Sequence, residues 1–112
     1  MNEHDRKTIK KMIEHSDHLL EYTSGCFSMD EFSKDTMLVE ACVFNLVQIG
    51  ELAHSELSDS TKESLNTIPW RQIYGMRNRI VHGYSSVNFA VVWETITNDI
   101  KPLKQQLEES LR

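Results

Sequence analysis

The spacing of apolar residues along the chain predicts helices throughout. Over Glu3–Tyr22, apolar positions recur at the three- and four-residue spacing that places them on one face of a helix. A longer helix is predicted over residues 34–57, where apolar positions cover a wide arc, as in a central helix buried against several neighbours. No segment alternates with a period of two for long enough to predict a strand.

Two further helices are predicted in the second half of the chain. Pro69 suits the first turn of a helix over residues 69–82, because proline lacks the N–H that a helix start leaves unpaired. Gly83 suits its end, where a left-handed residue is often needed. Ser86 or Asn88 can cap the last helix, whose apolar stripe continues to the C-terminal residues.

Shorter features divide these long segments. Ser28 with Glu31 has the spacing of a capping box and opens either a short turn or the next helix. Ser60 with Glu63 is a second capping box and predicts a brief helical turn. Pro102 interrupts the last apolar stripe and predicts a kink. The pattern as a whole predicts an all-α, up-and-down bundle of four main helices plus a short helical turn.

Composition adds the size and the setting. The 112 residues predict a single domain over 1–112, and apolar (39%) and charged (26%) contents are those of an ordinary globular protein. The longest unbroken apolar runs are only a few residues, so we expect no membrane span and no signal peptide. Cys26 and Cys42 fit no zinc spacing, and their scarcity favours a reducing, cytoplasmic location.

The charge distribution is uneven. The net charge of −5 argues against a general nucleic-acid binder, but residues 64–93 contain no Asp or Glu. This window carries three arginines, a charge of +3, so the rest of the chain carries −8. A focused positive patch on an acidic protein can attract phosphate, although a short window can also lack acids by chance.

Arg77 lies among apolar positions of the helix predicted over residues 69–82. At about 100° per residue it falls between Ile80 and Val81 on the wheel. A charge on a packing face is costly unless something pairs with it. Two interpretations follow: Arg77 pairs with a carboxylate such as Glu51 or Glu40 and joins two helices, or it grips a phosphate bidentately in a cleft.

His82 follows Arg77 at the predicted helix end. It is the one residue nearby that can exchange a proton near neutral pH. The alternative is a surface histidine that helps to end the helix. Trp70 and Trp93 are expected in the core or at a seam between subunits rather than as base-stacking platforms.

Metal chemistry is a rival interpretation. Glu51-x-x-His54 has the spacing of a ligand pair in di-iron bundles, which need a second such pair and two further glutamates. The chain has no second copy. We therefore expect no metal and no cofactor, with Glu51 paired to an arginine and His54 solvated. His15 and His18 are expected to be ordinary surface histidines.

Several of these residues fit a known pattern. Arg77-x4-His82-x-Tyr84 resembles the motif of the HEPN superfamily, and specifically of the HepT-like toxins. The run IPWRQIYGMRNRIVHGY resembles that family's motif helix, and NLVQIGELA resembles its second-helix segment, which ends in Gly-Glu. With the order of the helices, the resemblance covers nearly the whole chain.

The resemblance implies a fold, an activity and partners. It implies a HEPN-like bundle that forms a homodimer and brings two motifs into a shared cleft. It implies a metal-independent endoribonuclease, with tRNA as one candidate substrate, that is the toxin of a type VII-like toxin–antitoxin pair. The partner would be a minimal nucleotidyltransferase antitoxin that transfers AMP onto Tyr84. After the motif tyrosine, many members of the family continue with Phe-Gly and an acidic residue, whereas this chain has Ser85-Ser86 after Tyr84.

These residue types suit such chemistry. His82 can move the proton of the RNA 2′-hydroxyl or of the leaving 5′-oxygen, and Arg77 can stabilise charge on the phosphate. Asn78 either orients substrate or fixes the turn, and Tyr84 either accepts AMP or packs at the helix junction. The alternative to a ribonuclease is a catalytically inactive HEPN-like interaction module, or a nucleotide-binding subunit of a nucleotidyltransferase complex.

Overall fold

The computed structural model describes residues 1–80 and 87–112. This part of the chain is helical and contains no strand, which confirms the all-α prediction. Four helices are long, as predicted, but α2 and α4 each have six residues and η1 is a π-helical turn, so the sequence predicted too few short elements. The elements are α1 (Glu3–Tyr22), α2 (Met29–Lys34), α3 (Thr36–Glu51), η1 (Leu52–Glu56), α4 (Asp59–Ser64), α5 (Trp70–Ile80) and α6 (Phe89–Ser110).

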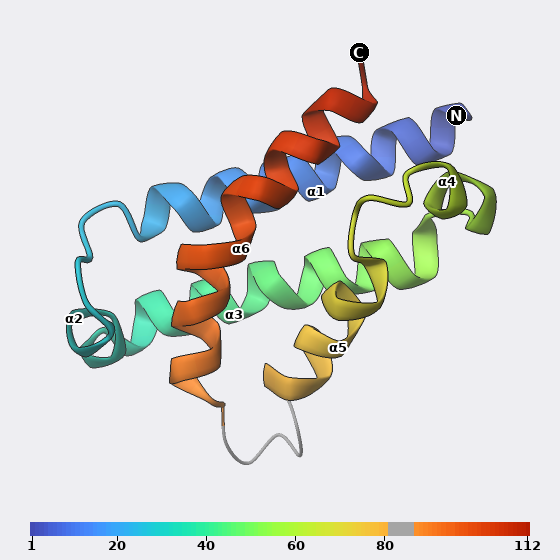
Figure 1. Ribbon diagram of the computed structural model, residues 1–112. Helices are drawn as coiled ribbons and strands as arrows, with labels where there is room; N and C mark the ends of the chain where they lie inside the picture. The colour runs from blue at the N-terminus through green and yellow to red at the C-terminus, as the bar shows by residue number, and fades with distance from the viewer. Residues whose placement is uncertain (81–86) are drawn as a thin grey trace.

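Helix α6 crosses a pair of antiparallel helices. In Figure 1, α1 and α3 lie side by side and run in opposite directions, α6 contacts both, and α5 lies against α3 and η1. Apolar residues from all the long helices meet between these layers. Each fully buried Leu, Ile or Phe there contributes about 1.5–3 kcal/mol. The largest fully buried apolar side chains are Phe32, Ile9, Met12, Leu19, Leu46, Ile49, Ile80, Ile100 and Leu107.

The first helix has the bounds that the apolar spacing predicted. Asn2 caps it, because its side chain accepts a hydrogen bond of 2.7 Å from the backbone N–H of Asp5. On the buried face, Ser16 satisfies its hydroxyl by donating to the carbonyl of Met12 at 2.9 Å. A polar residue therefore stays on the core face without an unpaired group.

Asp35 separates α2 from α3. Its backbone is extended (φ −98°, ψ 90°), and its carboxylate accepts a hydrogen bond of 3.1 Å from the N–H of Leu38. The predicted helix over residues 34–57 therefore begins later, at Thr36. The Ser28 and Glu31 pair caps α2 as predicted: the N–H of Glu31 donates to the Ser28 hydroxyl at 3.2 Å.

The π-helical turn η1 follows α3 directly. The N–H of Leu57 donates to the carbonyl of Leu52 at 3.2 Å, five residues back. The Lys62 ammonium donates to the carbonyl of Ala53 at 3.0 Å and holds this wide turn from α4. The second predicted helix thus changes type before its end, because hydrogen bonding in η1 runs over five residues instead of four.

A buried carboxylate joins α1 to α4. Asp5 is 1% exposed and accepts hydrogen bonds from the Ser58 hydroxyl (2.6 Å), the Thr61 hydroxyl (2.5 Å) and the Ser58 N–H (3.2 Å). The bonds from the Ser58 and Thr61 hydroxyls lower the pKa of Asp5 below its ordinary value. Ser58 also caps α4, so the prediction that Ser60 caps this helix is wrong: Ser60 is its second residue.

Helix α6 begins as predicted and then bends. Asn88, one of the two predicted caps, accepts a hydrogen bond of 3.1 Å from the N–H of Val91. The helix continues through Pro102, and its ribbon changes direction partway along its length (Figure 1). A proline removes one helix hydrogen bond, which accounts for a bend without a break. Lys104 lies 2.6 Å from the Asp17 carboxylate and ties α6 to α1.

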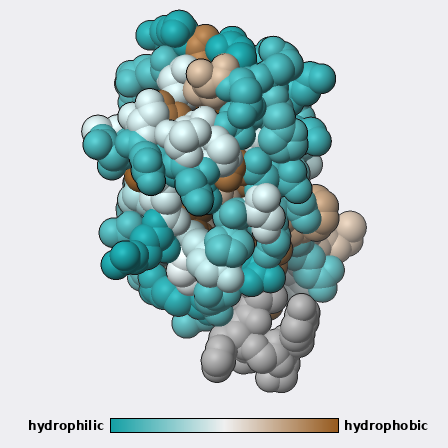
Figure 2. All heavy atoms as spheres, turned by 90° about the vertical axis from the view of Figure 1, so that its right-hand side faces the viewer, coloured by the Kyte–Doolittle hydropathy of each residue, from teal (hydrophilic) through white to brown (hydrophobic). Residues whose placement is uncertain are grey.

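The helical stretch Thr36–Glu56 is the one described segment long and apolar enough to cross a membrane by length and composition alone. The sequence prediction of no such segment did not anticipate it. The indication is weak, because core helices meet the same criterion and this one packs against α1, α5 and α6. The face of the molecule in Figure 2 is mostly hydrophilic, with apolar atoms in small separate areas.

Candidate functional site

The motif helix α5 packs with its apolar face inward. Ile73, Met76 and Ile80 are buried, at the spacing that the sequence predicted. Trp70 fixes the start of the helix, because its indole N–H donates to the carbonyls of Lys62 and Leu65, each at 3.1 Å. The indole is thus used in packing, as expected, and α5 is held at its first turn.

Arg77 lies where α5 meets α3. Its side chain is 30% exposed, and Nε lies 2.5 Å from Oε1 of Glu51. Of the two carboxylates proposed from the sequence, Glu51 is therefore the partner and Glu40 is not. The Nε–H bond does not point at this oxygen, so the contact is an ion pair without hydrogen-bond geometry. Such a partly exposed pair contributes about 0–1 kcal/mol to stability.

Another nitrogen of the guanidinium, Nη1, bonds to the next residue along α5. Nη1 donates a hydrogen bond of 3.1 Å to the amide oxygen of Asn78, which is exposed. No described residue accepts a hydrogen bond from Nη2. Glu51 and Asn78 thus hold the guanidinium from two sides and leave donors that suit a phosphate oxygen.

Gly50 makes this arrangement possible. A Cβ at this position would lie 2.9 Å from the Cβ of Arg77 and 3.6 Å from the carbonyl oxygen of Ile73. Real Cβ atoms do not approach a Cβ so closely, so only glycine lets α3 and α5 come together here. The sequence singled out Gly50-Glu51 as a pair, and the structure shows a separate use for each residue.

The remaining predicted site residues are not described. His82 and Tyr84, with Gly83 and Ser85-Ser86, lie outside residues 1–80 and 87–112. Their roles stay predictions. Within the described residues, Asn78 and Arg79 of α5 and Asn88 and Val91 of α6 line an open surface depression of about 470 Å³.

The histidines that we considered as metal ligands make other contacts. His54 is exposed, as expected, but stacks on Tyr74 with ring centroids 4.0 Å apart and planes 11° apart. The Nδ1 atoms of His15 and His18 lie 2.7 Å and 3.2 Å from the amide oxygen of Asn45. Within the described residues, no three His, Cys, Asp or Glu side chains gather as a metal site.

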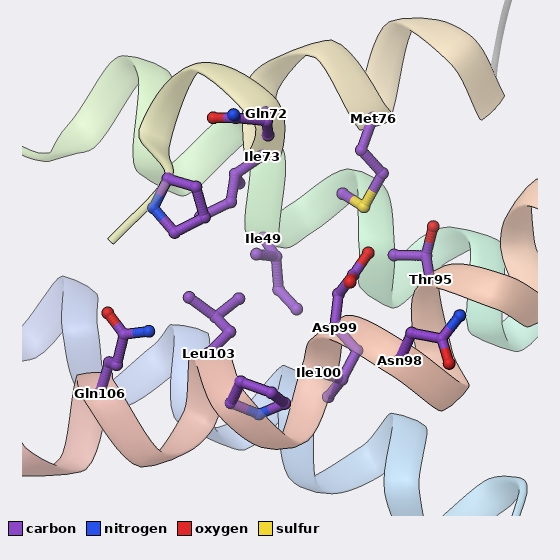
Figure 3. Close-up of a pocket in the computed structure, with 12 residues that line it drawn as sticks. Ile49, Gln72, Ile73, Met76, Thr95, Asn98, Asp99, Ile100, Leu103 and Gln106 are labelled. Carbon is purple, nitrogen blue, oxygen red and sulfur yellow. The ribbon is translucent and has the colours of Figure 1, made fainter. Parts of the chain in front are cut away.

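A second cavity, of about 360 Å³, lies between α5 and α6 (Figure 3). Ile49, Ile73, Met76 and Leu103 give it apolar walls, and Figure 3 shows polar side chains at its edges. Arg77 does not line this groove, so the groove and the Arg77–Glu51 contact are separate features of the same helix. The residues that line its edges include Gln72, Asn98, Asp99 and Gln106.

Comparisons with known proteins show which family the chain resembles. Residues 12–110 match the family model described as Ribonuclease HepT-like. The protein named "Putative RNase TTE0752" of Caldanaerobacter subterraneus is 35% identical over 107 residues, covering 96% of this chain and 94% of that protein. "Probable ribonuclease HepT" of Thermococcus cleftensis is 28% identical over 104 residues, covering 85% and 94%. No solved structure gives a significant match.

Proposed function

The chain belongs to the ribonuclease HepT-like family, and from this premise we propose that it is a metal-independent endoribonuclease that acts through Arg77 and His82. The observation that carries the proposal is the setting of Arg77. Its guanidinium is half-buried, paired with Glu51 and bonded to Asn78, on the helix that leads to His82. A cation held in this way is oriented before substrate arrives.

The proposed reaction uses the nucleophile that RNA itself carries. His82 takes the proton of a 2′-hydroxyl, whose oxygen attacks the adjacent phosphorus while the bond to the 5′-oxygen breaks. The protonated imidazole of His82 then gives its proton to the leaving 5′-oxygen, so the products are a 2′,3′-cyclic phosphate and a 5′-hydroxyl. Arg77 stabilises the charge that develops on the phosphate oxygens, and Asn78 orients Arg77 through its amide oxygen.

The proposal extends to assembly. Two copies would form a homodimer that brings both Arg77 side chains to one cleft. We place the second copy over the groove beside α5, whose apolar walls include Ile73 and Met76. Two like charges in one cleft then require anions, which an RNA backbone supplies.

The proposed biological setting is a toxin–antitoxin pair of type VII-like organisation. A minimal nucleotidyltransferase antitoxin would transfer AMP to the hydroxyl of Tyr84, two residues beyond His82. The added nucleotide is bulky and anionic, so it would occupy the cleft and compete with RNA for Arg77. Intact-mass measurement after co-expression should show the added AMP on the wild type and none on Tyr84→Phe.

One observation favours the alternative function. The Arg77–Glu51 pair also joins α3 to α5, as it would in an inactive interaction module or a nucleotide-binding subunit. Growth and cellular RNA fragments should be measured after expression of the wild type, Arg77→Ala and His82→Ala without antitoxin, and in vitro cleavage should be repeated with a chelator. Both variants should lose toxicity and cleavage. Arg6→Ala, which removes a half-buried arginine from α1, should keep both.

The outcomes separate the two functions. Cleavage by the wild type that disappears in both motif variants supports the ribonuclease. Toxicity or cleavage that persists in both variants removes the catalytic assignment, and a wild type that never cleaves RNA leaves the interaction module. Loss of cleavage in the chelator would refute metal independence alone.

A further inference from the structure

An exposed imidazole lies stacked on an aromatic ring beside Arg77. The His54 and Tyr74 rings are nearly parallel, at 11°, with centroids 4.0 Å apart. Tyr74 is half-buried and His54 is exposed, so one face of the imidazole rests on the phenol ring and the other faces solvent. The pair therefore presents a flat aromatic surface on the outside of the molecule.

The π-helical turn brings His54 to this position. His54 lies in the middle of η1, and a π turn changes the angle between successive side chains from that of an α-helix. Lys62 donates to the carbonyls of Ala53 (3.0 Å) and His54 (3.5 Å), so the backbone under the imidazole is held in place.

On α5, the stack lies within one turn of the proposed phosphate-binding group. Tyr74 precedes Arg77 by three residues, and residues three apart are neighbours on the surface of an α-helix. Three residues rise about 4.5 Å along the helix axis, and each stacked nucleotide adds about 3.4 Å, so the separation is that of one to two nucleotides.

We propose that the His54–Tyr74 stack is a base-stacking subsite for single-stranded RNA, next to the phosphate held by Arg77. This inference rests on the proposed function and names the form of its substrate. Aromatic surfaces bind the unstacked bases of single strands, which double-stranded RNA does not offer. Stacking accepts any base, so the subsite positions the strand without reading its sequence.

The charges around the stack agree with this role. Helix α5 contains no acidic residue, and Arg71, Arg77 and Arg79 give it a positive charge along its length. The nearest carboxylates along η1 are already engaged: Glu51 with Arg77, and Glu56 with His4 at 3.3 Å. A phosphate backbone can therefore follow α5 while a base rests on His54.

The test measures binding apart from cleavage. The probe is a fluorescent single-stranded 2′-O-methyl oligouridylate, which lacks the nucleophilic 2′-hydroxyl and so cannot be cut. Its Kd is measured by anisotropy for the wild type, His54→Ala and His54→Phe. His54→Ala should raise Kd about five- to tenfold, at the lower end of base–aromatic stacking, and His54→Phe should restore it.

Two controls make the result specific. His18 and Tyr22 form another stacked histidine–tyrosine pair, with centroids 5.5 Å apart, on α1. His18→Ala should leave Kd unchanged. An oligomer with abasic sugars should bind the wild type as weakly as His54→Ala binds the uridylate, with no further loss in the variant.

Some outcomes would overturn the inference. His54→Ala with an unchanged Kd and a lowered melting temperature would show that the stack only braces η1 against α5. An equal loss for duplex and single strand would remove the base contact. Failure of this subsite is distinct from failure of the ribonuclease, because cleavage that requires Arg77 and His82 can persist while His54→Ala has no effect on Kd.

Discussion

The contact between Gly50 and Arg77 leads to a quantitative prediction for Gly50→Ala. Replacing a glycine inside a helix by alanine stabilises the helix by about 1 kcal/mol. At position 50 this gain is opposed by a clash, because the new Cβ would lie 2.9 Å from the Cβ of Arg77. That atom is the root of a side chain rather than a flexible end, so α3 and α5 must separate by a few tenths of an ångström.

Gly75 provides the matched control. It lies inside α5, and a Cβ there would meet nothing within 4 Å. Gly75→Ala should therefore raise the free energy of unfolding by about 1 kcal/mol. Overpacking costs about 1–3 kcal/mol, so the free energy of unfolding of Gly50→Ala should lie below that of Gly75→Ala by this amount. Relative to the wild type, Gly50→Ala should be neutral to destabilising.

Urea denaturation followed by far-ultraviolet circular dichroism measures both variants in the same way. Both variants gain the same helix propensity, so the difference between their free energies of unfolding measures the cost of the clash. If Gly50→Ala stabilises the protein as much as Gly75→Ala does, α3 and α5 do not approach each other closely at Arg77, and position 50 does not require glycine.

Two further predictions concern buried titratable groups. Because the pKa of Asp5 is lowered in the fold, the hydrogen bonds to its carboxylate stabilise the protein fully at pH values above its ordinary pKa of 3.8. This contribution is lost as the pH falls through the lower pKa of the folded state. Asp5→Asn should therefore lower stability at neutral pH and flatten the acid limb of a stability–pH curve, and an unchanged acid limb would contradict this. Burial raises the pKa of the Cys42 thiol to about 12. A thiol reagent should therefore label half-buried Cys26 in the native protein and Cys42 only on unfolding. Rapid labelling of Cys42 in the native protein would refute its burial.

The apolar spacing predicted most of the fold because it records which side chains face the core. The bounds of α1 and the buried face of α5 follow directly from it. It could not place Asp5, whose partners Ser58 and Thr61 lie 53 and 56 residues away along the chain. It also could not show the π turn, because the change from four-residue to five-residue hydrogen bonding leaves no mark in the apolar pattern.

The sequence also predicted part of the candidate site. The position of Arg77 on an apolar arc correctly indicated a partner, and of the candidates Glu51 and Glu40 the sequence favoured Glu51 as the residue paired to an arginine. The choice depends on how closely α3 approaches α5, which Gly50 decides. The stacking of His54 on Tyr74 is a contact between two elements, so no local sequence pattern predicted it. The roles of His82 and Tyr84 stay predictions, because the described residues do not include them.

The packing of α6 against α1 has a consequence for how the molecule assembles. These helices are the first and last long elements, and Leu107 of α6 is fully buried. Local pairing of α1 with α3 closes a short loop, whereas docking α6 brings together segments from opposite ends of the chain at a larger entropic cost. We therefore expect α6 to dock late in folding. Weakening its contacts would chiefly shorten the lifetime of the native state and leave the speed of folding almost unchanged.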